Sequence, residues 1–99
     1  MAFGIKREEL KAWKRKVQAG EMAFITHYWI HPRYPNITTV TKAGCSDLKK
    51  LIAWGETYGL KKEWIHQRDE YPHFDLIGPK QKEILISEQL WDQIQKFHL

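Results

Sequence analysis

The sequence predicts a small α/β or α+β domain, in which a short sheet of mixed strand direction has helices packed against it. Segments with helical periodicity alternate with segments rich in β-branched and aromatic residues, which predicts both kinds of structure in one unit. The chain has 99 residues, the length of one domain rather than two. Its hydrophobic share is 42% and it contains five Trp, enough for a large core. We therefore expect residues 1–99 to form a single domain.

The first predicted element is a helix from about Lys6 to Ala19. Leu10, Trp13 and Val17 lie at the spacing of one apolar stripe, which predicts the face that this helix buries. Gly20 follows directly and favours the end of the helix there.

Three strands are expected. The segments 22–29 and 37–41 are rich in β-branched and aromatic residues, which favour strands. The two prolines in segment 30–36 predict a loop between them. Segment 62–66 is expected to be the third strand.

A second helix is expected after Gly44-Cys45-Ser46-Asp47, with Ser46 as its N-cap. Gly59 is expected to adopt the left-handed backbone conformation that ends a helix, and Leu60 is expected to fold back on the last turn. The buried face is expected to comprise Leu48, Leu51, Ile52 and Tyr58.

The C-terminal third begins with a short apolar segment, 74–77. Gly78 and Pro79 then open a new element, but the pattern of Lys80–Ile86 leaves helix and strand both open. Ser87 is expected to cap a final helix, Glu88–Phe97. Its predicted inner face comprises Leu90, Trp91, Ile94 and Phe97.

Several function classes lack support in the sequence. The N-terminus is charged and lacks the apolar run of a signal peptide, and no stretch approaches the roughly 20 apolar residues that cross a bilayer. Cys45 is the only cysteine, so no internal disulfide can form. There is no Gly-rich nucleotide-binding motif. We expect a cytoplasmic protein with no membrane partner and no cofactor.

The region 38–85 contains a series of short motifs: Ser-Asp-Leu-Lys-Lys-Leu at 46–51, Tyr-Gly-Leu at 58–60, Glu-Trp-Ile-His-Gln at 63–67 and Pro-His-Phe-Asp-Leu at 72–76. These motifs resemble an uncharacterised bacterial family, a domain of unknown function with a C-terminal His-Tyr/Phe-Asp motif. The whole chain resembles the short YneQ-type proteins of bacilli. The resemblance implies a fold and marks the His-Phe-Asp motif, but it implies no substrate.

His73-Phe74-Asp75 is the sharpest candidate for chemistry. On a strand, His73 and Asp75 would lie side by side while Phe74 enters the core. A carboxylate beside an imidazole can support general-base catalysis or bind a metal, and His66 could converge on the pair across the intervening loop. The alternative is a structural role in which His73 bonds a loop carbonyl and Asp75 caps the turn at Gly78.

Two other features are interpreted as structural. His27 and His31 are four residues apart, but Pro32 disfavours the helix that would bring them together. Cys45 precedes a helix, where a small buried residue is more common than a nucleophile. We therefore assign no metal ligand with this spacing and no cysteine nucleophile.

Nucleic acid is the leading partner class. The net charge of +4 and pI of about 9.2 favour contact with a polyanion. The first helix is basic, and the loop at 28–34 mixes aromatic rings with basic groups, which suits base stacking beside phosphate contacts. The candidate nucleic-acid-binding residues are Lys11, Lys14, Arg15, Trp29, Arg33 and Tyr34.

Three functions remain open. The favoured one is a non-enzymatic binding module for nucleic acid or a ribonucleoprotein, because the chain lacks a complete catalytic signature. The second is a small hydrolase, metal-assisted or not, that uses His73, Asp75 and His66. The third is a protein–protein adaptor or homodimer that uses exposed aromatic side chains. The chain is therefore more consistent with a binding protein than with an enzyme.

Overall fold

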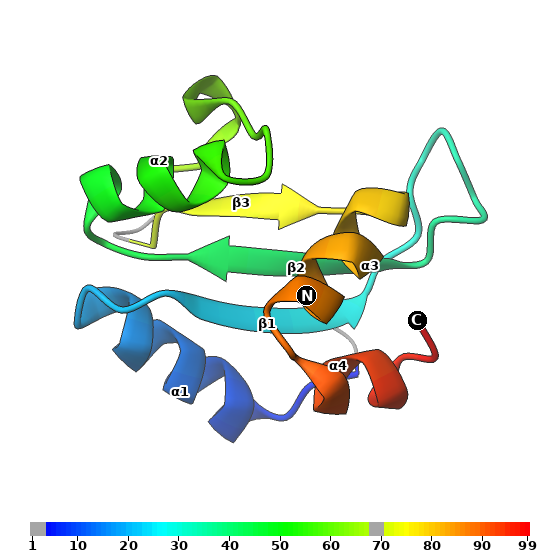
Figure 1. The fold of residues 1–99 in the computed structure, drawn as a ribbon. Coiled ribbons are helices and arrows are strands. Elements are labelled where there is room, and N and C mark those ends of the chain that lie inside the picture. Colours follow the sequence, from blue (N-terminus) through cyan, green and yellow to red (C-terminus); the bar gives the residue numbers. More distant parts are fainter. Residues whose placement is uncertain (1–3, 68–70) are drawn as a thin grey trace.

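A computed structural model describes residues 4–67 and 71–99. Three strands, β1 (Ala23–Tyr28), β2 (Thr39–Gly44) and β3 (His73–Leu76), form one sheet in the order β1-β2-β3 (Figure 1). Both pairings are antiparallel, with Thr26 opposite Thr41 and Lys42 opposite Asp75. The fold class is therefore α+β, and the expected mixture of strand directions is wrong.

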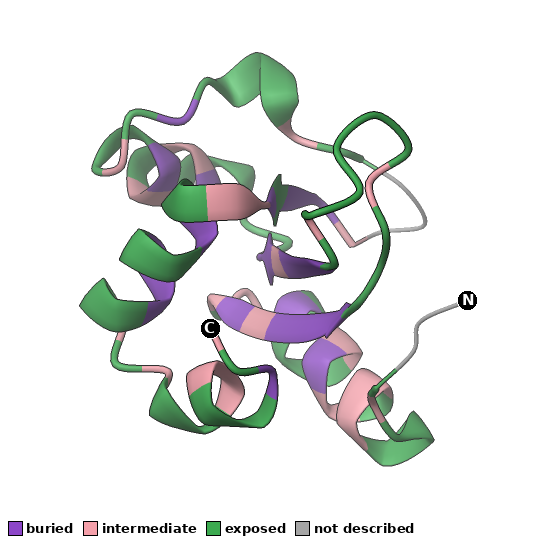
Figure 2. Cartoon of the chain, turned by 90° about the vertical axis from the view of Figure 1, so that its right-hand side faces the viewer, coloured by how far each residue is buried: buried purple, intermediate pink, exposed green. Residues whose placement is uncertain are grey.

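Helices cover both faces of the sheet. Helix α1 (Arg7–Gln18) lies on one face, and α2 (Leu48–Glu56), α3 (Gly78–Ser87) and α4 (Trp91–Lys96) lie on the other (Figure 2). We call these the α1 face and the closed face. Side chains alternate between them along each strand. Among the described residues, no helix is long and apolar enough to cross a membrane.

The α1 face contains the smaller core. Trp13 and Val17 of α1 are buried against Ala23 and Ile25 of β1, as the apolar stripe predicted. The indole Nε1 of Trp13 donates a hydrogen bond to the carbonyl of Ala23 at 3.1 Å. Because α1 packs along β1, the charged side chains of β2 and β3 on this face reach solvent.

The closed face contains the larger core, centred on Phe74. Its ring lies against Gly55 of α2 so closely that a Cβ there would come within 2.7 Å of the ring. This contact explains the glycine in the last turn of α2, where glycine is otherwise a poor helix former. The buried members of this core are Ala43, Cys45, Leu51, Leu60, Phe74, Leu76 and Ile84.

A chain of buried hydrogen bonds fastens α3 to the closed face. The hydroxyl of Thr39 donates to Oε1 of Gln81 at 3.1 Å, and Nε2 of Gln81 donates to Oγ1 of Thr41 at 3.0 Å. Gln81 is 2% exposed, so both ends of its amide need partners within the protein. The two threonines supply them.

The same chain continues to α4. Thr26 donates to Oε1 of Gln93 at 2.6 Å, so its single hydroxyl proton is committed and the 2.6 Å contact with Thr41 must be donated by Thr41. Nε2 of Gln93 then donates to the carbonyl of Phe24 at 3.1 Å. Every donor of this Thr–Gln relay therefore points the same way, from Thr39 to Phe24.

The N-cap of α2 differs from the prediction. Asp47 caps the helix through Oδ1, which accepts from the backbone N–H of Lys50 at 3.2 Å. Ser46 donates to the carbonyl of Gln18 instead. At the other end, Gly59 has φ +74 and the Leu60 amide bonds the carbonyl of Gly55, which confirms the predicted stop.

The buried face of α2 is narrower than predicted. Leu51 is fully buried, as expected, whereas Ile52 and Tyr58 are only half-buried. Leu48 is 37% exposed. It lies in the first turn of α2, one residue after the N-cap.

The third predicted strand is wrong over most of its length. Residues Lys62–Trp64 form a short 3-10 helix, η1, and only His66 pairs with the sheet, in an isolated antiparallel bridge to His73. The strand that completes the sheet is β3, and His66 adds a single residue at its outer edge.

The C-terminal region contains two helices where one was expected. The undecided segment Lys80–Ile86 is helical, within α3, and Pro79 occupies its first turn as predicted. Ser87 ends α3 and does not cap α4, which begins at Trp91. Trp91 is 56% exposed, so it does not belong to an inner face, whereas Phe97 is buried.

Candidate functional site

Three predicted residues meet at the β3 edge of the α1 face. Nε2 of His66 lies 3.1 Å from Oδ2 of Asp75, and Nε2 of His73 lies 3.4 Å from Oδ1. The two imidazole rings stack at 5.4 Å with planes 25° apart. His73 and Asp75 share a face because they alternate with Phe74, which is buried on the other side. The backbone bridge brings His66 beside them.

The hydrogen bonds fix the proton on His73. Its Nδ1 lies 2.9 Å from the carbonyl oxygen of Tyr71, which can only accept, so Nδ1 carries a proton. Nε2 lies 3.4 Å from Oδ1 of Asp75 and donates to it only when the imidazole carries a second proton. His73 is buried and lies edge-on to the Trp13 ring at 6.1 Å. The imidazole of His73 is therefore held by Tyr71, Asp75 and Trp13.

The carboxyl group of Asp75 remains charged in this setting. Burial alone would raise its pKa, but the hydrogen bond from His73 and the positive charges of His73, His66 and Lys42 together lower the pKa below its ordinary value. Asp75 can therefore hold the Nε2–H of His66 and leave Nδ1 of that half-exposed ring available.

A cavity of about 430 Å³ lies beside His66. Besides His66 and Asp75, its lining residues are Leu60, Glu63, Trp64, Ile65 and Phe74. Within residues 4–67 and 71–99, no three His, Cys, Asp or Glu side chains are arranged to hold a metal ion. The convergence predicted for His66, His73 and Asp75 thus produces a hydrogen-bonded cluster.

Two residues outside the predicted site lie on the same face of the sheet, Lys42 beside the cluster and His27 further along β1. Lys42 of β2 lies directly opposite Asp75 of β3. On the other side of β2, Lys42 lies opposite Ile25 of β1, whose side chain is on the α1 face. His27 lies two residues further along β1 and is buried, and desolvation lowers its pKa. Strand alternation could have placed Lys42 on this face, but the strand register was needed to put it beside Asp75.

The aromatic loop after β1 is held in a defined shape. The centroid of the His31 ring lies 5.3 Å from that of Trp29 and 5.2 Å from that of Tyr34. Trp29, Tyr34 and Arg33 are exposed. The amide of Trp29 donates a hydrogen bond to the carbonyl of Thr38, so the pairing of the two strands continues one residue past β1. Because Trp29 follows Ile25 and His27 at intervals of two residues, its side chain is expected on the α1 face.

The predicted basic residues of α1 lie on different sides of the helix. Nζ of Lys14 lies 5.3 Å above the ring of Tyr71, and Gln18 donates to the Tyr71 hydroxyl. Lys11 lies one turn before Lys14, on the same flank, toward β3. Arg15 is exposed and, by helical periodicity, faces away from the sheet. The structure therefore places Lys11 and Lys14, but not Arg15, along the α1 face.

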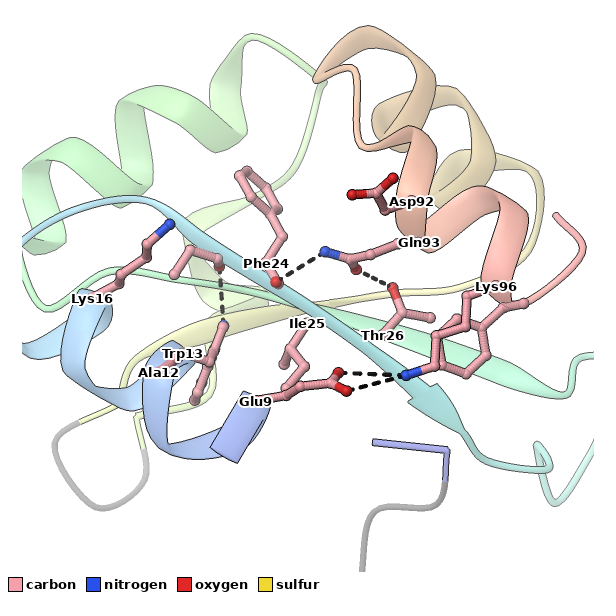
Figure 3. A pocket seen from close by; sticks show the side chains of 12 residues that line it. Glu9, Ala12, Trp13, Lys16, Phe24, Ile25, Thr26, Asp92, Gln93 and Lys96 are labelled. Atoms are coloured by element: carbon pink, nitrogen blue, oxygen red, sulfur yellow. Dashed lines mark hydrogen bonds and ion pairs between the residues drawn. The ribbon is translucent and has the colours of Figure 1, made fainter. Parts of the chain in front are cut away.

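A second cleft, of about 380 Å³, follows the outer edge of β1 between α1 and α4 (Figure 3). Lys96 and Glu9 form an ion pair across it at 3.3 Å. Nε2 of Gln93 donates a hydrogen bond to the carbonyl oxygen of Phe24. These contacts block the addition of another strand to β1.

The fold and the site define a small α+β protein whose three-stranded antiparallel sheet carries a charged cluster on a face only partly covered by one helix. The chain is 61% identical over 99 residues, the full length of both proteins, to "Uncharacterized protein YneQ" of Bacillus subtilis strain 168. It therefore belongs to the YneQ family of bacterial proteins. No protein-family model and no solved structure matches it.

Proposed function

We propose that the protein is a binding module for single-stranded nucleic acid, and that the strand lies on the α1 face. The observation that carries the proposal is that exposed aromatic rings and basic groups share one face of the sheet. Trp29 and Tyr34 lie in the loop at the Thr39 end of β2, whereas Lys42 and His66 lie toward its Gly44 end. Aromatic rings beside basic groups are what unpaired bases and their phosphates require.

The two parts of the surface have different tasks in this proposal. Trp29 and Tyr34 stack on bases, because every base has a π-face and stacking needs no particular sequence. Lys42 and the Lys11–Lys14 flank of α1 contact phosphates. Both carboxylate oxygens of Asp75 contact imidazole nitrogens, of His66 and His73, and Lys42 lies opposite Asp75 on β2.

Fluorescence anisotropy with a labelled 12-nucleotide oligouridine RNA tests the proposal at low salt, where the electrostatic contribution is largest. Trp29→Ala should weaken binding by about 1–3 kcal/mol if the ring stacks on a base. Trp91→Ala is the matched control, since Trp91 is also exposed but lies on α4. Absence of binding at low salt, or an equal loss in both variants, would contradict the proposal.

The charge contribution is tested by the salt dependence. Replacing Lys11 and Lys14 by Glu should weaken binding to all sequences and flatten the dependence of log K on log salt. Lys82→Glu is the control, because Lys82 is an exposed lysine of α3, on the closed face. A salt slope that is the same for the α1 variant and the wild type would remove α1 from the site.

A second candidate function is hydrolysis with His66 as general base, favoured by the 3.1 Å contact that orients its ring on Asp75 beside a cavity. In this proposal Nδ1 takes a proton from a water whose oxygen attacks the ester carbonyl carbon, and the ester C–O bond then breaks to release the alcohol or phenolate. His73 acts only by holding Asp75. Hydrolysis of p-nitrophenyl acetate should then be lost in His66→Ala and in Asp75→Asn but kept in His31→Ala. Equal rates in all four proteins would exclude it.

A further inference from the structure

The imidazole of His31 has two roles in the aromatic loop that no other side chain there could combine. Its Nδ1 accepts hydrogen bonds from the backbone N–H groups of Arg33 and Tyr34, at 3.0 and 3.1 Å. Its ring lies next to the rings of both Trp29 and Tyr34. The base of the loop is closed separately by the bond from the His31 amide to the carbonyl of Ile37.

An atom that accepts two N–H groups cannot itself carry a proton. His31 is therefore neutral in this conformation, with its proton on Nε2. Protonation of Nδ1 would remove the lone pair and bring a third N–H against the two backbone donors. The turn at 31–34 would then lose both of its side-chain hydrogen bonds, while the bond to Ile37 could remain.

We infer that His31 is a positioning residue for the stacking surface, and that protonation of Nδ1 releases Trp29 and Tyr34 from their fixed arrangement. The inference rests on the proposed function for its consequence, because a less ordered pair of rings binds bases with a larger loss of entropy. Nucleic-acid affinity should fall as the pH falls through the range in which histidines ionise.

Among the described residues, the groups that contact His31 or lie on the strand leading to it are the ones the experiment must consider. Arg33 and the phenol of Tyr34 belong to the same turn, and His27 lies on the adjoining strand β1. Between pH 5 and 8 free arginine and tyrosine side chains do not change charge, whereas free histidine does. His27 can titrate in that range, so the experiment must separate it from His31.

NMR of the free protein tests the inference without any nucleic acid. Between about pH 8 and pH 5 the amide resonances of Arg33 and Tyr34 should move with the same midpoint as the His31 ring. His31→Asn keeps an oxygen that can accept from the same N–H groups but does not ionise. In His31→Asn the two amides should stay at their high-pH positions, and in His31→Phe, which keeps a ring but has no acceptor, they should resemble the low-pH state throughout.

The outcomes distinguish this inference from the proposed function. Arg33 and Tyr34 amides that do not follow the His31 ring, or that titrate equally in His31→Asn, would overturn the role of His31. If the amides follow His31 but the oligouridine does not bind at any pH, the inference about the loop stands and the proposed function fails. Retained pH-dependent affinity in His31→Asn would assign the effect to another histidine of this face, such as His27, His66 or His73, and contradict the inference.

Discussion

On the closed face, each side chain of the Thr–Gln relay has its partners within the protein, whereas on the α1 face Nε2 of the buried His27 has no hydrogen-bond partner among the described residues. The closed face is covered by three helices, and the polar groups of the relay are matched in one direction, while Nε1 of Trp54 on the same side has no partner among the described residues. The α1 face has one helix, which packs along β1, and the charged pair Lys42 and Asp75 lies on β2 and β3. The difference teaches which face specifies the fold and which is available for binding.

The largest effect is expected in the core of the closed face. Leu51→Ala should lower the free energy of unfolding by about 2–5 kcal/mol, because Leu51 is fully buried and the surrounding side chains cannot fill the space. Leu48→Ala is the same change one turn earlier in α2, at a residue that is 37% exposed. Urea denaturation of both variants should separate them clearly. Equal losses would show that the register of α2 on the sheet is wrong.

The relay should come next. Thr41→Val keeps the shape of the side chain but removes the donor to Thr26 and the acceptor for Gln81. We expect a loss of about 1–3 kcal/mol, the cost of leaving buried polar groups without partners. Thr38→Val, an exposed neighbour just before β2, is the control and should cost less than 0.5 kcal/mol. A neutral Thr41→Val would mean that the relay does not fasten α3 and α4.

On the α1 face, Asp75→Asn should cost only about 1 kcal/mol or less, because the carboxylate is more than a third exposed and solvent screens its charges. The pKa of Asp75 is lowered by folding below 3.8, so its contribution is present at neutral pH and is lost as the pH falls through the folded pKa. The difference between Asp75→Asn and the wild type should therefore shrink below about pH 4 in denaturation at several pH values. A difference that grows toward acid pH would contradict this.

His27 should give the smallest effect at neutral pH and a growing one in acid. Burial lowers the pKa of His27, so the unfolded chain takes up its proton first and the folded state loses stability as the pH falls from about 6.5. His27→Leu removes this group, and its stability relative to the wild type should increase between pH 7 and pH 5. Thermal unfolding at intervals of half a pH unit measures it, and a constant difference would exclude His27 as the source.

The sequence predicted the parts of the structure that depend on local patterns. The stripe of Trp13 and Val17, the stop at Gly59 and the alternation of His73, Phe74 and Asp75 each follow from periodicity or from glycine geometry. These signals act over a few residues, and the structure agrees with them.

The errors lie where long-range packing decides. Segment 62–66 has strand composition, yet only His66 finds a partner strand, so the rest forms η1. Ser87 resembles a cap, but α3 continues to it because Ile84 and Leu85 are buried in the core. Likewise, nothing local indicates that Lys42 lies opposite Asp75, or that His31 accepts two backbone N–H groups.

The central claim, that the closed face holds the fold while the α1 face binds, is tested most directly by NMR of the isotope-labelled protein titrated with oligouridine RNA at low salt. We expect shifts at Trp29, Tyr34, Lys42 and His66, and unchanged resonances for Gln81 of α3 and Gln93 of α4, whose side chains bond to the closed face of the sheet. Shifts confined to α3 and α4, or no shifts at any RNA concentration, would contradict the assignment of binding to the α1 face.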